Sequence, residues 1–307
     1  GGNMPKNNLK QAMLPVGGTV FENNHGTAPG AALEKNGKCV IILPGPPGEL
    51  VPMFNESARG FLKKYSDGAI VSHTVNIIGM GESSVAEEIE DMFDAKNPTV
   101  APYAKSGEVR LRITAKAETA DEADKMCAPV VDEICSRLGD VVYGTDMNSI
   151  EERVVALLKE KGKKIATAES CTAGYIPKRL TDIPGASEVF ECGIVSYSND
   201  IKTKLLGVSP KTLETYGAVS EQTAREMALG AKHVSGADIA ISTTGLAGPG
   251  GDGVLPGGLS FAAVTDGERT VVEKIVTGHE NDREYNRYVT ASRALNLARL
   301  MLEEKIK

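Results

Sequence analysis

The sequence has few of the residues that build disulfide frameworks or hold metal ions. Its 307 residues include five cysteines, an odd number, and no two of them form a CxxC pair; they are Cys39, Cys127, Cys135, Cys171 and Cys192. This usage argues against a disulfide framework and against a thiolate metal site. It fits a protein of the reducing cytoplasm, and we expect no metal ion to be bound.

Long apolar runs and dense basic runs are also missing. No apolar run approaches the roughly 20 residues of a membrane span. No cluster of Lys and Arg is dense enough to follow a nucleic-acid backbone or an anionic membrane. The formal net charge is -7, from 34 basic and 41 acidic residues, and 41% of the residues are hydrophobic. We therefore expect a globular protein of two or three domains, with neither nucleic acid nor membrane as a partner.

The first predicted domain covers residues 1–66. The stretch "GTVFENNHGTAPGAALEKNGKCVIILPGPPGELVPMF" reads as two short strands, the second at 38–43, then a proline-rich turn and a helix. About 65 residues is small for an independent core. We therefore expect the N-terminal part of this domain to be missing from the chain.

The second predicted domain, residues 67–147, is a small α+β unit. A strand, a turn and a helix follow His73, and Ser84 and Glu87 are spaced as a capping box. Residues 108–117 alternate with period two, as in a half-buried strand. An amphipathic helix then ends at Gly139.

The third predicted domain covers residues 148–307. Ser149 and Glu152 are spaced as a capping box for a helix that runs through Lys161. Strands and helices then alternate, which is typical of a layered α/β domain, and two late adjacent strands indicate a mixed sheet. The expected strands are 164–167, 189–197, 238–243, 259–265 and 270–276; the expected helices begin at Gly174, lie near Lys202, and span 220–233 and about 282–304.

The stretch "IATAESCTAGY" places Ser170 between a strand and a helix. Open α/β sheets bind ligands at this edge, and the N–H groups of the following helix are suited to hold an oxyanion. The alternative is that Ser170 or Thr172 only caps the helix. Cys171 is intrinsically the better nucleophile, but no histidine adjoins it to hold a thiolate.

A serine nucleophile needs a base, and the sequence has only four histidines. His233 resembles a residue at a helix C-terminus, which leaves His279 as the one tempting histidine. The stretch "VSYSNDIKTKLLGV" offers Tyr197, Lys202 and Lys204 instead, directly after a strand. The alternative for these lysines is a solvated helix face.

Two further stretches point to ligand binding. "TTGLAGPGGDGVLPGGLSF" joins two strands, so it is neither a Walker loop nor a dinucleotide fingerprint. It is either a ligand loop or a floppy hairpin, and its density of glycine favours the ligand loop. "GHENDREYNR" puts Arg283 and Arg287 near the start of the last helix, where they either clamp a phosphate or form an ordinary surface pair.

Taken together, these motifs closely resemble the CinA family of competence/damage-inducible proteins. The resemblance rests on "AESCTAG", "GASEVFECGIVSYSNDIK", "YGAVSEQTAREMA", "TTGLAGPGG" and "NDR", with "LPGPPGEL" and "APYAKSGEVRLRITAKA" in the N-terminal half. It implies a multi-domain α/β fold: part of a molybdopterin-binding-like α/β domain, a small α+β subdomain, and a C-terminal layered α/β amidase domain with a mixed sheet.

The family's C-terminal domain is a nicotinamide-nucleotide amidase. The resemblance implies hydrolysis of nicotinamide mononucleotide to nicotinate mononucleotide and ammonia in pyridine-nucleotide recycling, by a homodimer without a cofactor. It implies that Ser170 is the nucleophile and that Tyr197 and Lys202 activate it. It further implies substrate-binding roles for Thr244, Gly245, Gly248 and Arg283, with Ser187 nearby.

The sequence departs from the family at a few places. The family usually has Gly where Ala173 stands, and Pro-Val-Gly at 256–258 where this chain has Pro-Gly-Gly. The missing first part of the family's N-terminal domain carries its ADP-ribose pyrophosphatase motifs, so that activity is not expected of this chain. A competing hypothesis from another class is a binding or regulatory protein that keeps the fold without the activity.

Overall fold

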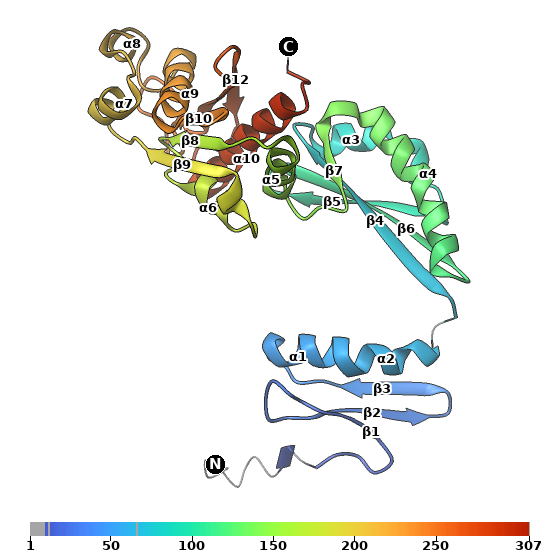
Figure 1. Ribbon diagram of the computed structural model, residues 1–307. Helices are drawn as coiled ribbons and strands as arrows, with labels where there is room; N and C mark the ends of the chain where they lie inside the picture. Colours follow the sequence, from blue (N-terminus) through green and yellow to red (C-terminus); the bar gives the residue numbers. More distant parts are fainter. Residues whose placement is uncertain (1–9, 12, 66, 307) are drawn as a thin grey trace. The chain divides into compact units, whose positions relative to one another are not determined.

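The computed structural model describes residues 10–11, 13–65 and 67–306, and the chain divides into two compact units, Gly1–Ala69 and Ile70–Lys307 (Figure 1). Each unit is described by itself. No helix among the described residues is long and apolar enough to cross a bilayer.

The first unit contains an antiparallel sheet covered by helix on one face. Its strand order is β1 (Thr19–Phe21), β2 (Gly30–Lys35), β3 (Lys38–Ile42). After the sheet come α1 (Pro47–Met53), η2 (Phe54–Ala58), α2 (Arg59–Leu62) and η3 (Lys63–Tyr65). Phe21, Ala32, Met53 and Ala58 form the core. The strand predicted at 38–43 corresponds to β3, but the sheet has three strands instead of the expected two. β1 has only three residues and so shows no periodic pattern.

The second unit begins with a four-stranded sheet of order β5-β6-β4-β7. These strands are β4 (Ala69–Ile78), β5 (Thr99–Lys105), β6 (Glu108–Ala117) and β7 (Val142–Thr145), and the helices are α3 (Glu82–Glu88), η4 (Glu90–Met92), α4 (Ala120–Leu138) and η5 (Gly139–Val141). The strand and the helix predicted at 108–117 and before Gly139 are confirmed. The capping box at Ser84 was wrong, because α3 already begins at Glu82 with Gly81 as its N-cap.

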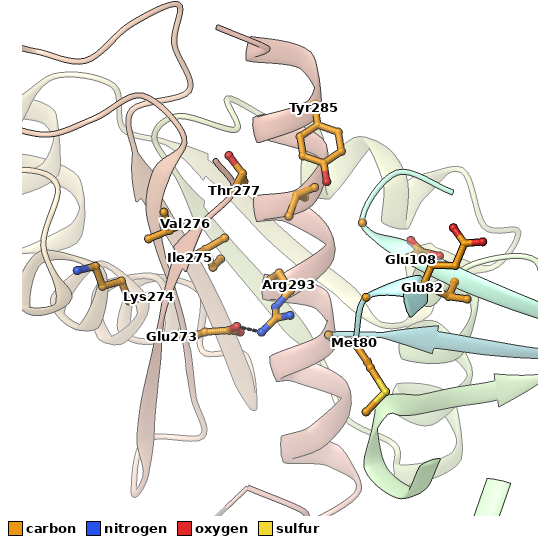
Figure 2. Close-up of a pocket in the computed structure, with 15 residues that line it drawn as sticks. Met80, Glu82, Glu108, Glu273, Lys274, Ile275, Val276, Thr277, Tyr285 and Arg293 are labelled. Atoms are coloured by element: carbon orange, nitrogen blue, oxygen red, sulfur yellow. Dashed lines mark hydrogen bonds and ion pairs between the residues drawn. The ribbon is translucent and has the colours of Figure 1, made fainter. Parts of the chain in front are cut away.

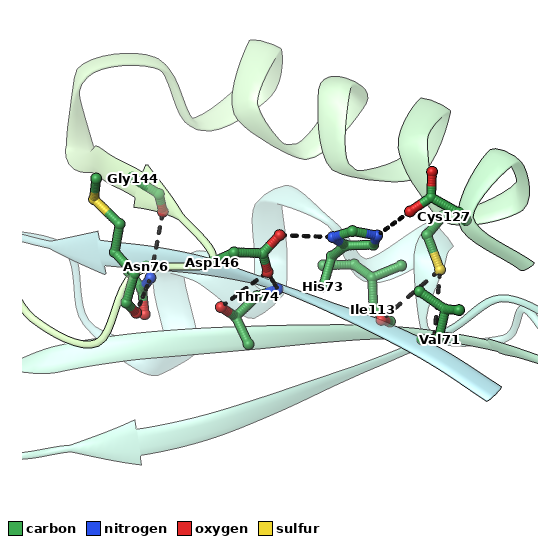
Figure 3. Close-up of polar contacts among 10 residues, drawn as sticks. Val71, His73, Thr74, Asn76, Ile113, Cys127, Gly144 and Asp146 are labelled. Carbon is green, nitrogen blue, oxygen red and sulfur yellow. Dashed lines mark hydrogen bonds and ion pairs between the residues drawn. The ribbon is translucent and has the colours of Figure 1, made fainter. Parts of the chain in front are cut away.

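A histidine joins three elements of this part (Figure 3). His73 on β4 lies 2.6 Å from Asp146, just after β7, and 2.9 Å from Asp124 on α4. Asp146 also accepts the backbone N–H of Thr74 at 2.7 Å. The two carboxylates raise the pKa of the His73 imidazole through hydrogen bonds and charge, against a smaller opposing effect of burial.

The rest of the second unit contains a five-stranded mixed sheet of order β12-β11-β10-β8-β9. Its strands are β8 (Ile165–Glu169), β9 (Phe190–Val195), β10 (Ile239–Gly245), β11 (Leu259–Thr265) and β12 (Thr270–Val276). β8 is parallel to β9 and β10, whereas β11 is antiparallel to both of its neighbours. The predicted mixed sheet is therefore confirmed.

Helices pack on both faces of this sheet (Figure 1). On one face, α5 (Ile150–Lys161) and α10 (Arg283–Leu302) bury the main core with residues such as Ile165 and Ile241; α6 (Tyr175–Thr181) packs beside them. On the other face, α9 (Glu221–Ser235) covers Ala166 and Ala168, with α7 (Asn199–Leu206) and α8 (Pro210–Tyr216) against it. Alternate residues of β8 thus face opposite layers.

The start of α5 differs slightly from its prediction. Ser149 caps the helix by accepting the N–H of Glu152 at 3.4 Å, but the Glu152 carboxylate accepts from the N–H of Asn148 at 2.8 Å. The predicted box is therefore half formed. The predicted boundary at 147/148 falls between β7 and α5, inside the second unit, and the three-domain division stays a prediction.

Candidate active site

Ser170 and Lys202 meet at the carboxyl edge of the mixed sheet. Ser170 follows β8, and Lys202 lies in α7, which follows the parallel neighbour β9. The Lys202 ammonium nitrogen Nζ is 3.1 Å from Ser170 Oγ and 2.7 Å from the backbone carbonyl of Ser196. Because parallel strands end at the same edge, their following segments converge there. The structure thus brings together the serine and the lysine that the sequence selected.

The environment of Lys202 favours its neutral form. Its side chain is 1% exposed, and no ion pair joins it to any residue in the described ranges. Burial lowers the pKa of the Lys202 amine, although the neighbouring Cys171 acts in the opposite direction. A lysine with a lowered pKa can accept the proton of a serine hydroxyl. Lys204, two residues later, is exposed and has no such surroundings.

Cys171 is poorly suited to be the nucleophile. Its side chain is 6% exposed, and burial raises the pKa of its thiol to about 12. The thiol therefore stays protonated near neutral pH, and the thiolate is the reactive form.

Glu169 occupies the place where an oxyanion was expected. It is 0% exposed, and its Oε2 accepts the N–H of Ile176, in the first turn of α6, at 3.2 Å. Burial raises the pKa of this carboxyl. The next N–H group, that of Tyr175, donates to the Thr172 carbonyl at 3.2 Å. These two donors already have acceptors in this structure, and the oxyanion role expected of the start of α6 stays a prediction.

The turn from Ser170 to Gly174 is held in an uncommon backbone conformation. Ala173 has φ 50° and Gly174 has φ 85°, both in the left-handed region that favours glycine. The Thr172 and Thr243 hydroxyls are 2.6 Å apart, and the Ser170 N–H donates to the Thr243 carbonyl at 2.9 Å. Gly174 is the N-cap of α6, so the alternative that Ser170 or Thr172 caps this helix was wrong.

A cavity of about 170 Å³ opens beside this turn. Cys171, Tyr197, Arg283 and the start of the glycine-rich loop, residues 245–251, line it. Arg283 donates to the Gly248 carbonyl at 2.8 Å and to the Tyr197 hydroxyl at 3.4 Å. The loop is fixed by backbone bonds, including Gly258 to Leu246 at 2.7 Å. Residues 245–251 of the loop therefore form one wall of the cavity.

Comparison with known proteins places the chain in a family. The description "CinA C-terminal domain" matches residues 147–302, and "Damage-inducible protein CinA KH domain" matches residues 72–144. The chain belongs to the CinA family. The small α+β part is therefore similar to the KH domain of CinA proteins.

Close relatives cover most of the chain. A competence-damage inducible protein of Clostridium beijerinckii is 53% identical to this chain over 281 residues, which are 91% of this chain and 68% of that protein. A CinA-like protein of Desulfovibrio desulfuricans is 46% identical over 95% of this chain and 70% of its own length. The crystal structure of the competence/damage inducible protein CihA from Agrobacterium tumefaciens is 38% identical, with a TM-score of 0.48, over 50% of this chain and 93% of that one.

Three residues selected from the CinA resemblance form no hydrogen bond with Ser170 or Lys202 in the described part of the chain. Tyr197 is 63% exposed on the cavity rim, and its one hydrogen bond in the described structure is to Arg283. Thr244 is 0% exposed and donates to the Ala218 carbonyl at 2.5 Å, outside the cavity lining. Ser187 is exposed in η6 (Ala186–Glu188), before the amino end of β9 and so at the opposite sheet edge. Their predicted roles stay predictions.

Some residues of the site were not selected from the sequence. Ser196 contributes only its carbonyl to Lys202, and a backbone group leaves no mark in a sequence. Thr243 on β10 contacts the turn through its hydroxyl and its carbonyl. Arg287 was considered only as a phosphate clamp or as part of an ordinary surface pair, whereas its Nη2 donates to the Thr172 carbonyl at 2.7 Å.

A larger cavity, of about 490 Å³, lies elsewhere in the second unit (Figure 2). The β4–α3 loop, the β5–β6 hairpin, β12 and α10 line it, and Arg293 forms an ion pair with Glu273 inside it. Thr277 is the one serine or threonine that lines this cavity, and its hydroxyl donates a hydrogen bond to the Asn286 side chain. This cavity therefore lacks a free nucleophile–base pair. Among the described residues, no group of three or more His, Cys, Asp or Glu is placed to hold a metal ion.

Proposed function

We propose that this chain is a nicotinamide-nucleotide amidase that converts nicotinamide mononucleotide and water to nicotinate mononucleotide and ammonia. The observation that carries the proposal is the buried Lys202 amine 3.1 Å from Ser170 Oγ, with its pKa lowered by burial. A serine activated by a lysine is a known arrangement for acyl transfer. Membership in the CinA family supports the choice of substrate.

The first half of the reaction acylates Ser170. Lys202 takes the hydroxyl proton while Ser170 Oγ bonds to the carboxamide carbon, giving a tetrahedral intermediate. Lys202 then returns this proton to the amide nitrogen, the C–N bond breaks, and ammonia leaves. The Ser196 carbonyl, 2.7 Å from Nζ, keeps the lysine aimed at the serine throughout.

The second half of the reaction releases the product. Water takes the place of ammonia, and Lys202 accepts one of its protons as the oxygen attacks the Ser170 ester. The ester C–O bond breaks, the proton passes to Ser170 Oγ, and nicotinate mononucleotide leaves. The original hydroxyl proton of Ser170 thus leaves in the ammonia, and a proton from the water replaces it.

The cavity beside the turn is the proposed nucleotide site. Gly245 and Gly248 line it without side chains, so substrate atoms can approach the backbone. Arg283 at the start of α10 supplies a positive charge on the same wall. We propose that Arg283 binds the substrate phosphate by charge-assisted hydrogen bonds. All of these groups lie in the predicted C-terminal domain, and we propose that the reaction needs no metal and no cofactor.

Ammonia release from nicotinamide mononucleotide tests the proposal. The Ser170→Ala variant should lose turnover by on the order of 10³-fold or more, because the nucleophile is gone. The Cys171→Ala variant is the matched control and should keep most of the activity. An inactive Cys171→Ala with an active Ser170→Ala would show that the nucleophile was wrongly chosen. A folded wild-type chain that releases no ammonia would favour a binding or regulatory role.

A further inference from the structure

Two arginines one helical turn apart on α10 contact different parts of the site. Arg283 is exposed and reaches the cavity wall at the Gly248 carbonyl, at 2.8 Å. Arg287 is half-buried and reaches the Thr172 carbonyl, at 2.7 Å, in the turn that carries Ser170. Residues four apart lie on the same helix face, so both point toward the sheet edge. Only Arg287 touches the segment that positions the nucleophile.

The Ser170 turn requires support from outside itself. Ala173 and Gly174 both have positive φ, and Gly174 has no side chain with which to cap α6. Within the turn, the Thr172 carbonyl accepts only the N–H of Tyr175. A carbonyl has two lone pairs, and the second one receives the Arg287 guanidinium. This bond ties the turn to a helix that is remote in sequence.

The helix that carries Arg287 is anchored on both sides of it. Asn286 donates to the Ala247 carbonyl at 2.9 Å and to the His279 carbonyl at 2.6 Å. Tyr288 donates to Glu108 at 3.0 Å, and its ring lies 6.3 Å from that of Tyr175. Arg287 therefore extends from a fixed point of α10, and its bond fixes the Thr172 carbonyl in space.

The guanidinium of Arg287 has one buried donor without a partner in the described structure. Its Nε is buried and has no hydrogen-bond partner among the described residues, and the group lies 5.7 Å from the Tyr175 ring. A buried donor without an acceptor costs free energy, so an arrangement that keeps one needs another reason. The bond to the Thr172 carbonyl supplies that reason.

We propose that Arg287 is a positioning residue for the serine nucleophile. By holding the Thr172 carbonyl it keeps Ser170 Oγ in line with Lys202 Nζ, whereas Arg283, on the same helix face, binds substrate. The inference rests on the proposed function for the identity of the substrate. Its main test does not depend on that substrate. That test asks how fast Ser170 reacts with a probe that resembles no nucleotide.

The experiment measures the rate at which a small alkyl fluorophosphonate labels Ser170 in the full chain. In this reaction Ser170 Oγ bonds to phosphorus, the P–F bond breaks, fluoride leaves, and the hydroxyl proton passes to Lys202. Arg287→Ala should slow labelling by on the order of 100-fold, because a displacement of about 1 Å at the reacting atom has effects of that size. Its kcat should fall in parallel, with KM for nicotinamide mononucleotide unchanged.

Two further measurements separate positioning from a general loss of structure. Arg287→Lys should recover part of the labelling rate, because lysine keeps one donor for the carbonyl. Free guanidinium ion at low concentration should speed labelling of Arg287→Ala but not of the wild type. The amount of fluoride released per chain counts the folded active sites, so that a partly unfolded variant is not mistaken for a slow one.

Arg293→Ala is the matched control. Arg293 lies on the same helix, also has a buried Nε without a partner among the described residues, and pairs with Glu273 away from the site. It should label at the wild-type rate. The proposal is overturned if Arg287→Ala labels at the wild-type rate, if it raises KM alone, or if wild-type Ser170 does not react. Labelling that depends on Arg287 in a chain that releases no ammonia would contradict the proposed substrate but support the positioning role.

Discussion

At the scale of single residues, the account depends on the protonation state of Lys202. Burial lowers the pKa of this amine below the ordinary value of 10.5. The neutral form is the base, so kcat/KM should rise as pH rises through this lowered pKa. We predict that the midpoint of the rise lies below 10.5 and that Lys202→Arg loses the activity, because arginine stays protonated.

A pH series of kcat/KM checks this prediction. Lys204→Met is the control, since Lys204 is exposed on the same helix, and its profile should overlay that of the wild type. A midpoint at or above the ordinary lysine value, or an active Lys202→Arg, would rule out Lys202 as the base.

The two positions at which the sequence was expected to depart from the CinA family have different structural environments. Ala173 has φ 50°, where an L-residue costs about 1–2 kcal/mol and glycine costs little. The Ser170 turn therefore carries strain that its hydrogen bonds must offset. Gly257 lets the Gly250 and Glu280 carbonyls approach closely, since a Cβ there would lie 2.4 and 2.5 Å from their oxygens. A valine at 257 would require this loop to move.

Residue types could be predicted from the sequence better than residue contacts. Their positions after strands made Ser170, Lys202 and Lys204 candidates, because parallel strands end at one edge, and the resemblance to the CinA family selected Ser170 and Lys202 among them. Tyr197 was also selected from the resemblance, and the hydrogen bond of its hydroxyl in the described structure is to Arg283. The contact of Glu169 could not be predicted, because nothing in the sequence shows that its carboxylate turns back to α6.

At the scale of elements, His73 gives the second unit a predicted pH dependence of stability. The folded pKa of His73 is raised above the unfolded value of about 6.5 by Asp146 and Asp124. Its contribution is therefore fully present below about pH 6.5 and is lost as pH rises through the folded pKa. We predict that the urea concentration at the unfolding midpoint of the second unit is lower at pH 8 than at pH 6. This decrease should be larger in the wild type than in His73→Gln.

Equilibrium unfolding in urea at several pH values measures this difference. His233→Gln is the control, because His233 is exposed near the end of α9 and should keep the wild-type dependence. An identical pH dependence in His73→Gln and the wild type would show that the contacts of His73 with the two carboxylates do not stabilise the fold.

Element positions were predicted best where one face is buried and the pattern is regular. The strands expected at 259–265 and 270–276 coincide with β11 and β12. The capping signal was less dependable, because a serine followed three residues later by a glutamate also occurs inside a first turn. That is the case at Ser84, whereas the box at Thr119 and Glu122 on α4 is fully formed and was not predicted.

At the scale of the whole molecule, the two compact units allow a truncation test. All groups of the proposed site lie in the second unit, which has its own cores. We predict that a fragment of residues 70–307 keeps the kcat/KM of the full chain for ammonia release. A folded fragment without activity, beside an active full chain, would show that the first unit contributes to the site.

A shorter fragment of residues 149–307 should also be active but less stable. The fully buried Arg299 donates to the Val142 and Asp140 carbonyls, and the core that includes α10 also includes Tyr143. Removing these partners breaks two hydrogen bonds of the guanidinium and uncovers apolar surface of that core, and both changes cost free energy. The urea midpoint of this fragment should therefore lie below that of 70–307; an equal midpoint would show that these contacts add nothing.

Long-range contacts of this kind could not be predicted from the sequence. Tyr288 and Glu108 are 180 residues apart and lie in segments that match two different parts of the CinA family. Nothing in either segment marks the other as its partner. Many of the strands and helices were predictable from local patterns, with β1 as an exception, whereas the packing of one part on another depends on surface shape.

The central claim is that Ser170 carries the acyl group during hydrolysis. The most direct measurement is rapid acid quench of the full chain turning over nicotinamide mononucleotide, followed by peptide mass spectrometry. The account predicts an ester of nicotinate mononucleotide on Ser170 that is absent from Ser170→Ala. Turnover with no adduct on any residue, or an adduct on Cys171 instead, would contradict it.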